Sequence, residues 1–259
     1  MLRFLVAIDH SVESSFALRV ACQLAGEGRG YVEALHVRAL SSETSDYGRG
    51  WAVHTYRREQ MQVAYRDMAD VIASESQTCG TQPELKLVSG TAVKEIAREL
   101  SKGSFDFLFM GSVHPLEGPH QGILTKLLHK VSCPIVVLKH YRPIRTVLVC
   151  LEEGTAADKA VSQAGTLLTG LNIPLDLVFS DEAGKKNAVQ ALLGEARKRL
   201  ASTDLEVGTR VLQGSQIQGF IELAPAYDLV ILGMPHPKKP GPLITGLLKT
   251  MPCPLMLCP

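Results

Sequence analysis

Residues 4–9 read Phe-Leu-Val-Ala-Ile-Asp, and residues 147–152 read Val-Leu-Val-Cys-Leu-Glu. Each stretch is an uninterrupted apolar run that ends at an acidic residue and is followed by a polar turn. A short apolar run of this kind, bounded by turn residues, is typical of a strand buried on both faces of a sheet. The two stretches therefore predict the first strand of two similar domains.

The repetition continues along both halves of the chain. Apolar residues at helical spacing follow each first strand, and later anchors agree in residue type and order. We therefore predict two domains, residues 1–140 and residues 144–259, of which the second is shorter. The anchors are the helix starts at Gly90-Thr91 and Gly214-Ser215, the strands that end at Gly111 and Gly233, and the Cys-Pro pairs at 133–134 and 253–254.

Each half reads as five apolar strands alternating with amphipathic helices, which favours a parallel sheet covered on both faces. We expect two tandem doubly wound α/β domains, each a Rossmann-like five-stranded parallel sheet with the order 3-2-1-4-5. In that order the turns after Asp9 and Gly111 flank one crevice, where a ligand would bind. The first half is longer because a polar loop at residues 40–53, which contains Trp51, precedes its second helix.

Composition excludes several classes of protein. The 259 residues are 46% apolar and 20% charged, which indicates a packed globular protein. The formal net charge is +1 and no basic tract occurs, so we expect neither nucleic acid nor membrane as a partner. The six cysteines form no Cys-x-x-Cys pair, and no apolar run approaches about 18 residues. These features predict a soluble, cytoplasmic chain with reduced thiols.

Four sequence features together resemble the universal stress protein family, across essentially the whole chain. They are Leu-Val-Ala-Ile-Asp-His-Ser at 5–11, Leu-His-Val at 35–37, the Met110-Gly111 strand end, and the Cys-Pro before each last strand. The resemblance implies the adenine-nucleotide alpha-hydrolase-like variant of the fold. It also implies intramolecular pairing of the domains through their last strands, because a tandem chain is similar to the family's dimer made covalent. A further homodimer and an unidentified regulatory protein partner remain open.

The phosphate loop of ATP-binding family members follows the pattern Gly-x2-Gly-x9-Gly-Ser/Thr, whose glycines let backbone N–H groups approach phosphates. Here Gly111 matches, but His114 replaces the second glycine, and Gln121-Gly122 follows Gly111 three positions early. In the second half the loop after Gly233 is shorter still and contains prolines at 235, 237, 240 and 242. Each proline removes a backbone donor.

The resemblance therefore implies at most one ATP or other adenine nucleotide, bound in the first domain, with the Asp9 carboxylate at the base. The second domain has Glu152 in place of Asp9, in an altered turn. The implied cofactor-binding residues are Ala7, Asp9, Val37, Met110, Gly111, His114, Gln121 and Gly122.

Each of these residues also has a simpler structural interpretation. Asp9 is equally consistent with a residue that caps the following helix. The glycines at 111 and 233 are more consistent with turns than with a ligand cradle, and His36 with a hydrogen-bonded core histidine. His114 and His236 recur as Gly-x-x-His-Pro, but no acidic or cysteine partner accompanies them, so we expect no metal.

Catalytic motifs are missing from the sequence: there is no Gly-x-Ser-x-Gly elbow, Walker loop or His-Glu-x-x-His zinc motif. This favours a non-enzymatic stress-response protein that acts through binding, as a covalent pseudo-dimer with weakened or lost ATP binding. The alternative is an adenine-nucleotide sensor that uses the first crevice. A third hypothesis, an enzyme, would depend on the His114 loop.

Overall fold

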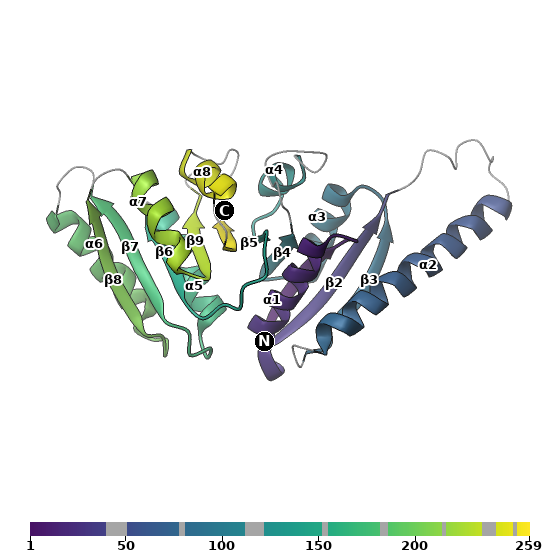
Figure 1. The fold of residues 1–259 in the computed structure, drawn as a ribbon, viewed down its shortest axis with the longest axis horizontal. Helices are drawn as coiled ribbons and strands as arrows, with labels where there is room; N and C mark the ends of the chain where they lie inside the picture. The colour runs from purple at the N-terminus through teal and green to yellow at the C-terminus, as the bar shows by residue number, and fades with distance from the viewer. Residues whose placement is uncertain are drawn as a thin grey trace. The chain divides into compact units, whose positions relative to one another are not determined.

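A computed structural model describes residues 1–39, 51–77, 81–111, 122–151, 155–181, 186–213, 216–234, 242–250 and 253–259 (Figure 1). The chain divides into two compact units, Met1–Gly111 and Ser112–Pro259. In the part of the chain that the structure describes, no helix has the length and apolarity needed to span a membrane.

The first unit is a parallel sheet with helices on both faces. Its strands lie in the order β3-β2-β1-β4, and every neighbouring pair is parallel. The elements are β1 (Leu2–Ile8), α1 (Val12–Arg29), β2 (Gly30–Arg38), α2 (Trp51–Ser76), β3 (Glu84–Ser89), α3 (Ala92–Gly103) and β4 (Phe107–Gly111).

The core of this unit forms because the strand side chains alternate between two helix layers. On one face the fully buried ring of Phe4 packs against Phe107 and Phe109, at centroid distances of 5.8 and 5.3 Å. Helix α1 covers this face and packs against α2. Glu33 on β2 points to the opposite face, where α3 contacts the sheet.

The second unit is a six-stranded sheet in the order β5-β10-β9-β6-β7-β8. All of its neighbouring pairs are parallel except β5 and β10, which are antiparallel. The elements are α4 (Ile123–Leu128), β5 (Ile135–Leu138), β6 (Val147–Leu151), α5 (Thr155–Leu168), β7 (Leu175–Asp181), α6 (Lys186–Leu200), β8 (Val207–Gln213), α7 (Gln216–Leu223), the 3-10 helix η2 (Ala224–Ala226), β9 (Leu229–Gly233), α8 (Pro242–Thr250) and β10 (Leu255–Cys258).

These observations confirm the predicted α/β class and the parallel sheets. Within the second unit, β8-β7-β6-β9-β10 is the predicted 3-2-1-4-5 order in full. The domain boundaries 1–140 and 144–259 stay predictions. One boundary was wrong: residues 51–53 were expected in a loop, but α2 begins at Trp51, because no glycine or proline after that position interrupts the helix.

Candidate functional site

Most of the predicted site residues gather at the carboxyl edge of the first sheet. Ala7 on β1 is paired with Met110 on β4, and Ile8 is paired with His36 on β2, one residue before Val37. Asp9 directly follows β1, and Gly111 ends β4. Three neighbouring strands therefore bring these positions to one edge. The remaining three predicted residues are placed otherwise: Gly122 precedes α4 in the second unit, and His114 and Gln121 lie outside the described residues.

The Asp9 carboxylate lies in the turn that joins β1 to α1. Its Oδ1 accepts a hydrogen bond from the backbone N–H of Ser11 at 2.8 Å and another from the Ser11 hydroxyl. The Ser11 hydroxyl oxygen in turn accepts from the N–H of Ser14 at 3.2 Å, which makes Ser11 the N-cap of α1. Asp9 thus supports the helix cap, as its simpler interpretation expects. Its recognition of an adenine base stays a prediction.

Ser14 is a structural residue of this turn that the sequence did not reveal. Its hydroxyl lies 2.9 Å from the carbonyl oxygens of both Asp9 and Ser11, and it accepts from the N–H of Asp9 at 3.1 Å. The side chain is only 2% exposed. Because a serine in the first turn of a helix usually faces solvent, only the Ser11-x-x-Ser14 spacing could have indicated it.

Gly111 and Gly233 are required by close packing of a helix on a strand end. A Cβ built on Gly111 would lie 2.1 Å from the backbone carbon of Glu13, in the first turn of α1. A Cβ on Gly233 would lie 1.8 Å from the backbone oxygen of Ala156, in the first turn of α5. Contacts between real Cβ atoms and backbone are never this short, so only glycine fits either position without movement. This supports the structural interpretation of both glycines.

His36 is a hydrogen-bonded histidine of the core. It is 7% exposed, and its Nδ1–H donates to the carbonyl oxygen of Ile8 at 3.0 Å. Burial lowers the pKa of His36, because the imidazolium form would lose its hydration, and the Ile8 carbonyl opposes this only in part. The ring of His10 meets it edge-on at 5.6 Å. A neutral His36 therefore lies one residue before Val37 at the candidate site.

The lowered pKa of His36 predicts a pH-dependent stability. The unfolded chain binds a proton near the usual pKa of 6.5, whereas the folded chain does not until a lower pH. This contribution is therefore fully present above pH 6.5 and is lost progressively as the pH falls from that value through the lower pKa of the folded chain. Urea unfolding at neutral pH and at about pH 5.5 should show a smaller loss in His36→Gln than in the wild type. An equal loss in both proteins would contradict the assignment.

The equivalent edge of the second unit is only partly described, because Glu152 and residues 235–241 lie outside the described residues. His236 is among them. In the ranges that the structure does describe, no group of three or more His, Cys, Asp or Glu side chains has the arrangement needed to hold a metal ion.

Comparison with known proteins identifies the family. Residues 1–139, more than half of the chain, match the model of the universal stress protein family. No curated protein was matched by the sequence. Among solved structures, a universal stress protein from Archaeoglobus fulgidus DSM 4304 is similar at a TM-score of 0.77 and 18% identity, covering 99% of this chain and 97% of that chain.

Two further solved structures extend the comparison. A functionally unknown protein from Pseudomonas aeruginosa PAO1 is similar at a TM-score of 0.60 and 15% identity, covering 98% of this chain and 91% of that chain. A universal stress protein solved in complex with cAMP is similar at a TM-score of 0.40 and 20% identity, covering 44% of this chain and 95% of that chain. The likenesses with TM-scores of 0.77 and 0.60 support the fold, and the family match supports the assignment: the chain belongs to the universal stress protein family.

Proposed function

We propose that this chain is a non-enzymatic, cytoplasmic universal stress protein that acts as a covalent pseudo-dimer in the stress response. The pairing of β5 with β10 carries the proposal. These are the last strands of the two repeats, and they pair antiparallel, Val136 opposite Met256, through fully buried side chains. Equivalent strands of two copies pair antiparallel when a two-fold axis relates them. The pair therefore has the form of a dimer contact made within one chain.

We further propose that ATP binding is weakened in the first repeat and lost in the second. Three observations support this. The loop after Gly111 is short and has His114 in place of a glycine, and the loop after Gly233 contains three prolines before α8 begins at a fourth. Both glycines are needed for the close packing of a helix on a strand end. Oδ1 of Asp9 already accepts two hydrogen bonds from Ser11.

The second candidate function is an adenine-nucleotide sensor with one ligand in the first repeat. One observation favours it: Ala7, Asp9, Val37 and Met110 meet at the carboxyl ends of three neighbouring parallel strands. Sheets of this class bind ligands outside the carboxyl ends of their strands, next to the point where the winding reverses. An acidic side chain there suits the amino group of an adenine base.

Calorimetric titration of the intact protein with ATP and AMP separates the two functions. We expect no saturable heat at millimolar nucleotide. Saturable binding would instead favour the sensor, and it should then weaken at least about tenfold in Asp9→Asn, since hydrogen bonds to a charged group contribute about 1.5–3 kcal/mol. The asparagine keeps an oxygen that can accept from Ser11, so the cap of α1 is retained. Measured turnover of ATP would contradict a non-enzymatic role.

Native mass spectrometry of the purified protein tests the assembly. If the pairing of β5 with β10 already satisfies the family's dimer contact, we expect the mass of a single chain with no bound nucleotide. A dimer of chains would show that a further surface mediates association. Additional mass on the chain would reveal a co-purifying regulatory partner.

The Met256→Pro variant measures the contribution of the strand pair. We expect it to lower the free energy of unfolding, because proline cannot be accommodated inside a sheet.

A further inference from the structure

The two repeats share an ion pair on the strand face opposite α1 and α5. In the first repeat, Lys86 on β3 pairs in the strand ladder with the residue two positions after Glu33. In the second repeat, Arg210 on β8 pairs in the same way with the residue two positions after Asp176. The two acids hold equivalent places, because each pairs with the second residue of the apolar runs 4–8 and 147–151. The ion pairs are 3.4 Å (Lys86 Nζ to Glu33 Oε1) and 3.1 Å (Arg210 Nε to Asp176 Oδ2).

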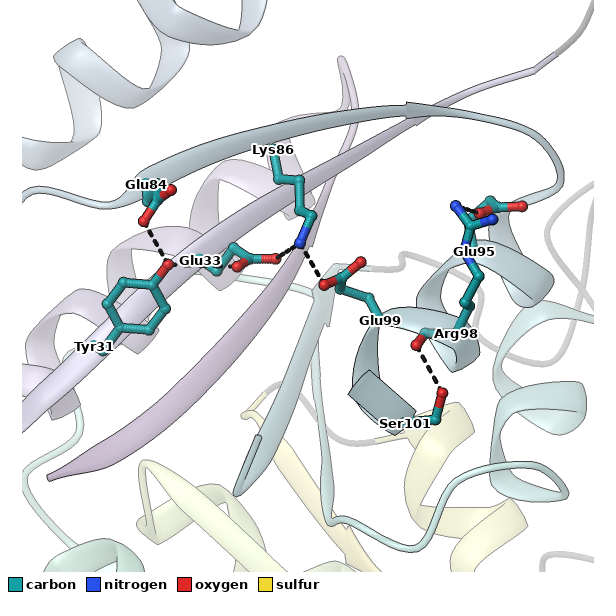
Figure 2. A network of polar contacts seen from close by, with 8 residues as sticks. All are labelled: Tyr31, Glu33, Glu84, Lys86, Glu95, Arg98, Glu99 and Ser101. Atoms are coloured by element: carbon teal, nitrogen blue, oxygen red, sulfur yellow. Dashed lines mark hydrogen bonds and ion pairs between the residues drawn. The ribbon is translucent and has the colours of Figure 1, made fainter. Parts of the chain in front are cut away.

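In the first repeat the lysine forms an ion pair with a second carboxylate. Figure 2 shows Lys86 reaching from β3 to Glu33 on β2 and to Glu99 on α3. Glu33 and Glu99 are both buried, and a hydrogen bond from Tyr31 to Glu84 at 2.6 Å lies beside them. Helix α3 thus supplies an internal anion to the lysine.

The second repeat has no carboxylate at the position of Glu99. Glu99 is the ninth residue after Gly90, and the ninth residue after the equivalent Gly214 is Leu223, the last residue of α7. Among the described residues, the ion pair of Arg210 is with Asp176 alone. The Arg210 side chain is 57% exposed, against 40% for Lys86. Within the described residues, Arg210 therefore keeps guanidinium N–H donors, whereas the ammonium group of Lys86 is paired with two carboxylates.

A cavity of about 310 Å³ lies over this arginine. Three of its polar side chains bond to one another: the hydroxyl of Tyr227 and Nε of Arg210 both donate to Oδ2 of Asp176. Pro174, Leu223 and Ala226 form apolar walls. The volume is at the small end of the range for ligand sites. A guanidinium with donors left over suits a carboxylate, which it can bind through two parallel hydrogen bonds.

We propose that this cavity binds a small aliphatic carboxylate, whose charged group pairs with Arg210 as Glu99 pairs with Lys86. The aliphatic part lies against Pro174, Leu223 and Ala226. This site lies at the amino-terminal ends of the second sheet's strands, on different residues from those of the nucleotide site, and does not depend on the proposed function.

Methyl NMR of the intact protein, with labelled leucine, tests the proposal. Isovalerate is the probe, and isoamyl alcohol is the matched ligand without charge. We expect isovalerate to shift the methyl signals of Leu223 in a saturable way, and the alcohol to bind at least about tenfold more weakly. Absence of saturable shifts at millimolar isovalerate, or equal affinity for the alcohol, would overturn the proposal.

Three variants locate the site. Arg210→Gln removes the cation from an exposed side chain, which leaves the fold intact, and should weaken isovalerate binding at least about tenfold. Leu223→Glu introduces the carboxylate of the first repeat and should exclude the ligand. Lys86→Gln is the matched control and should leave the affinity unchanged. Unchanged binding in Arg210→Gln, or loss of binding in Lys86→Gln, would refute the assignment.

Discussion

Replacing Gly233 by alanine is expected to lower the free energy of unfolding by about 3 kcal/mol, the upper part of the usual range for overpacking. The new Cβ would lie 1.8 Å from the backbone oxygen of Ala156 and 2.4 Å from its backbone carbon. A flexible side chain could turn away from such a contact, but the first turn of α5 can relieve it only by moving as a whole. We expect a similar loss for Gly111→Ala, whose Cβ would meet the backbone of Glu13.

Urea unfolding followed by far-ultraviolet circular dichroism measures both changes. Gly194→Ala is the matched control: this glycine lies within α6, and a Cβ there meets no atom within 4 Å. That variant should be more stable by about 0.5–1 kcal/mol, because alanine favours the helix. A change smaller than about 0.5 kcal/mol in Gly233→Ala, as expected of ordinary surface positions, would show that the start of α5 yields without strain.

The packing role of the glycines also explains why both repeats keep them. The loop after Gly233 contains three prolines, and α8 begins at a fourth, so four backbone donors are missing there for a phosphate. Even so, the glycine is present, and the contact with Ala156 accounts for it without a ligand. A glycine at this position therefore identifies the fold and does not by itself identify a nucleotide site.

The sequence predicted the fold because each strand and helix of this fold has a recognisable local sequence pattern. Apolar runs and helical spacing indicate strands and helices one at a time, and the repeat confirms each by a second copy. The candidate site was predicted only at Asp9 and its neighbouring strand ends. Ser14 was missed because its burial depends on how closely α1 approaches β4. The Lys86 cluster was missed because Glu33, Lys86 and Glu99 are far apart in sequence, and only the ladder register brings them together.

Replacing Asp228 by alanine is expected to lower the stability of the second repeat by about 3 kcal/mol, because several part-buried donors lose their common acceptor together. Oδ2 accepts from the backbone N–H groups of Arg145 and Thr146, at 3.0 and 3.1 Å, and from the Thr146 hydroxyl at 3.2 Å. Oδ1 forms an ion pair with Nε of Arg142 at 2.7 Å. Asp228 is 8% exposed, and its carboxylate links the chain that enters β6 to the start of β9.

The first repeat offers a matched comparison for this variant. Asp106 stands at the equivalent place before β4, and its Oδ2 accepts from the N–H of Arg3 at 2.7 Å. We expect Asp106→Ala to lower the stability by about 1–2 kcal/mol, and Asp228→Asn, which keeps one acceptor oxygen but loses the charge, to fall between the two alanine variants. Urea unfolding of the three proteins gives the order directly. If Asp228→Ala is no less stable than Asp106→Ala, the contacts of Asp228 with residues 142–146 do not determine the stability of the second repeat.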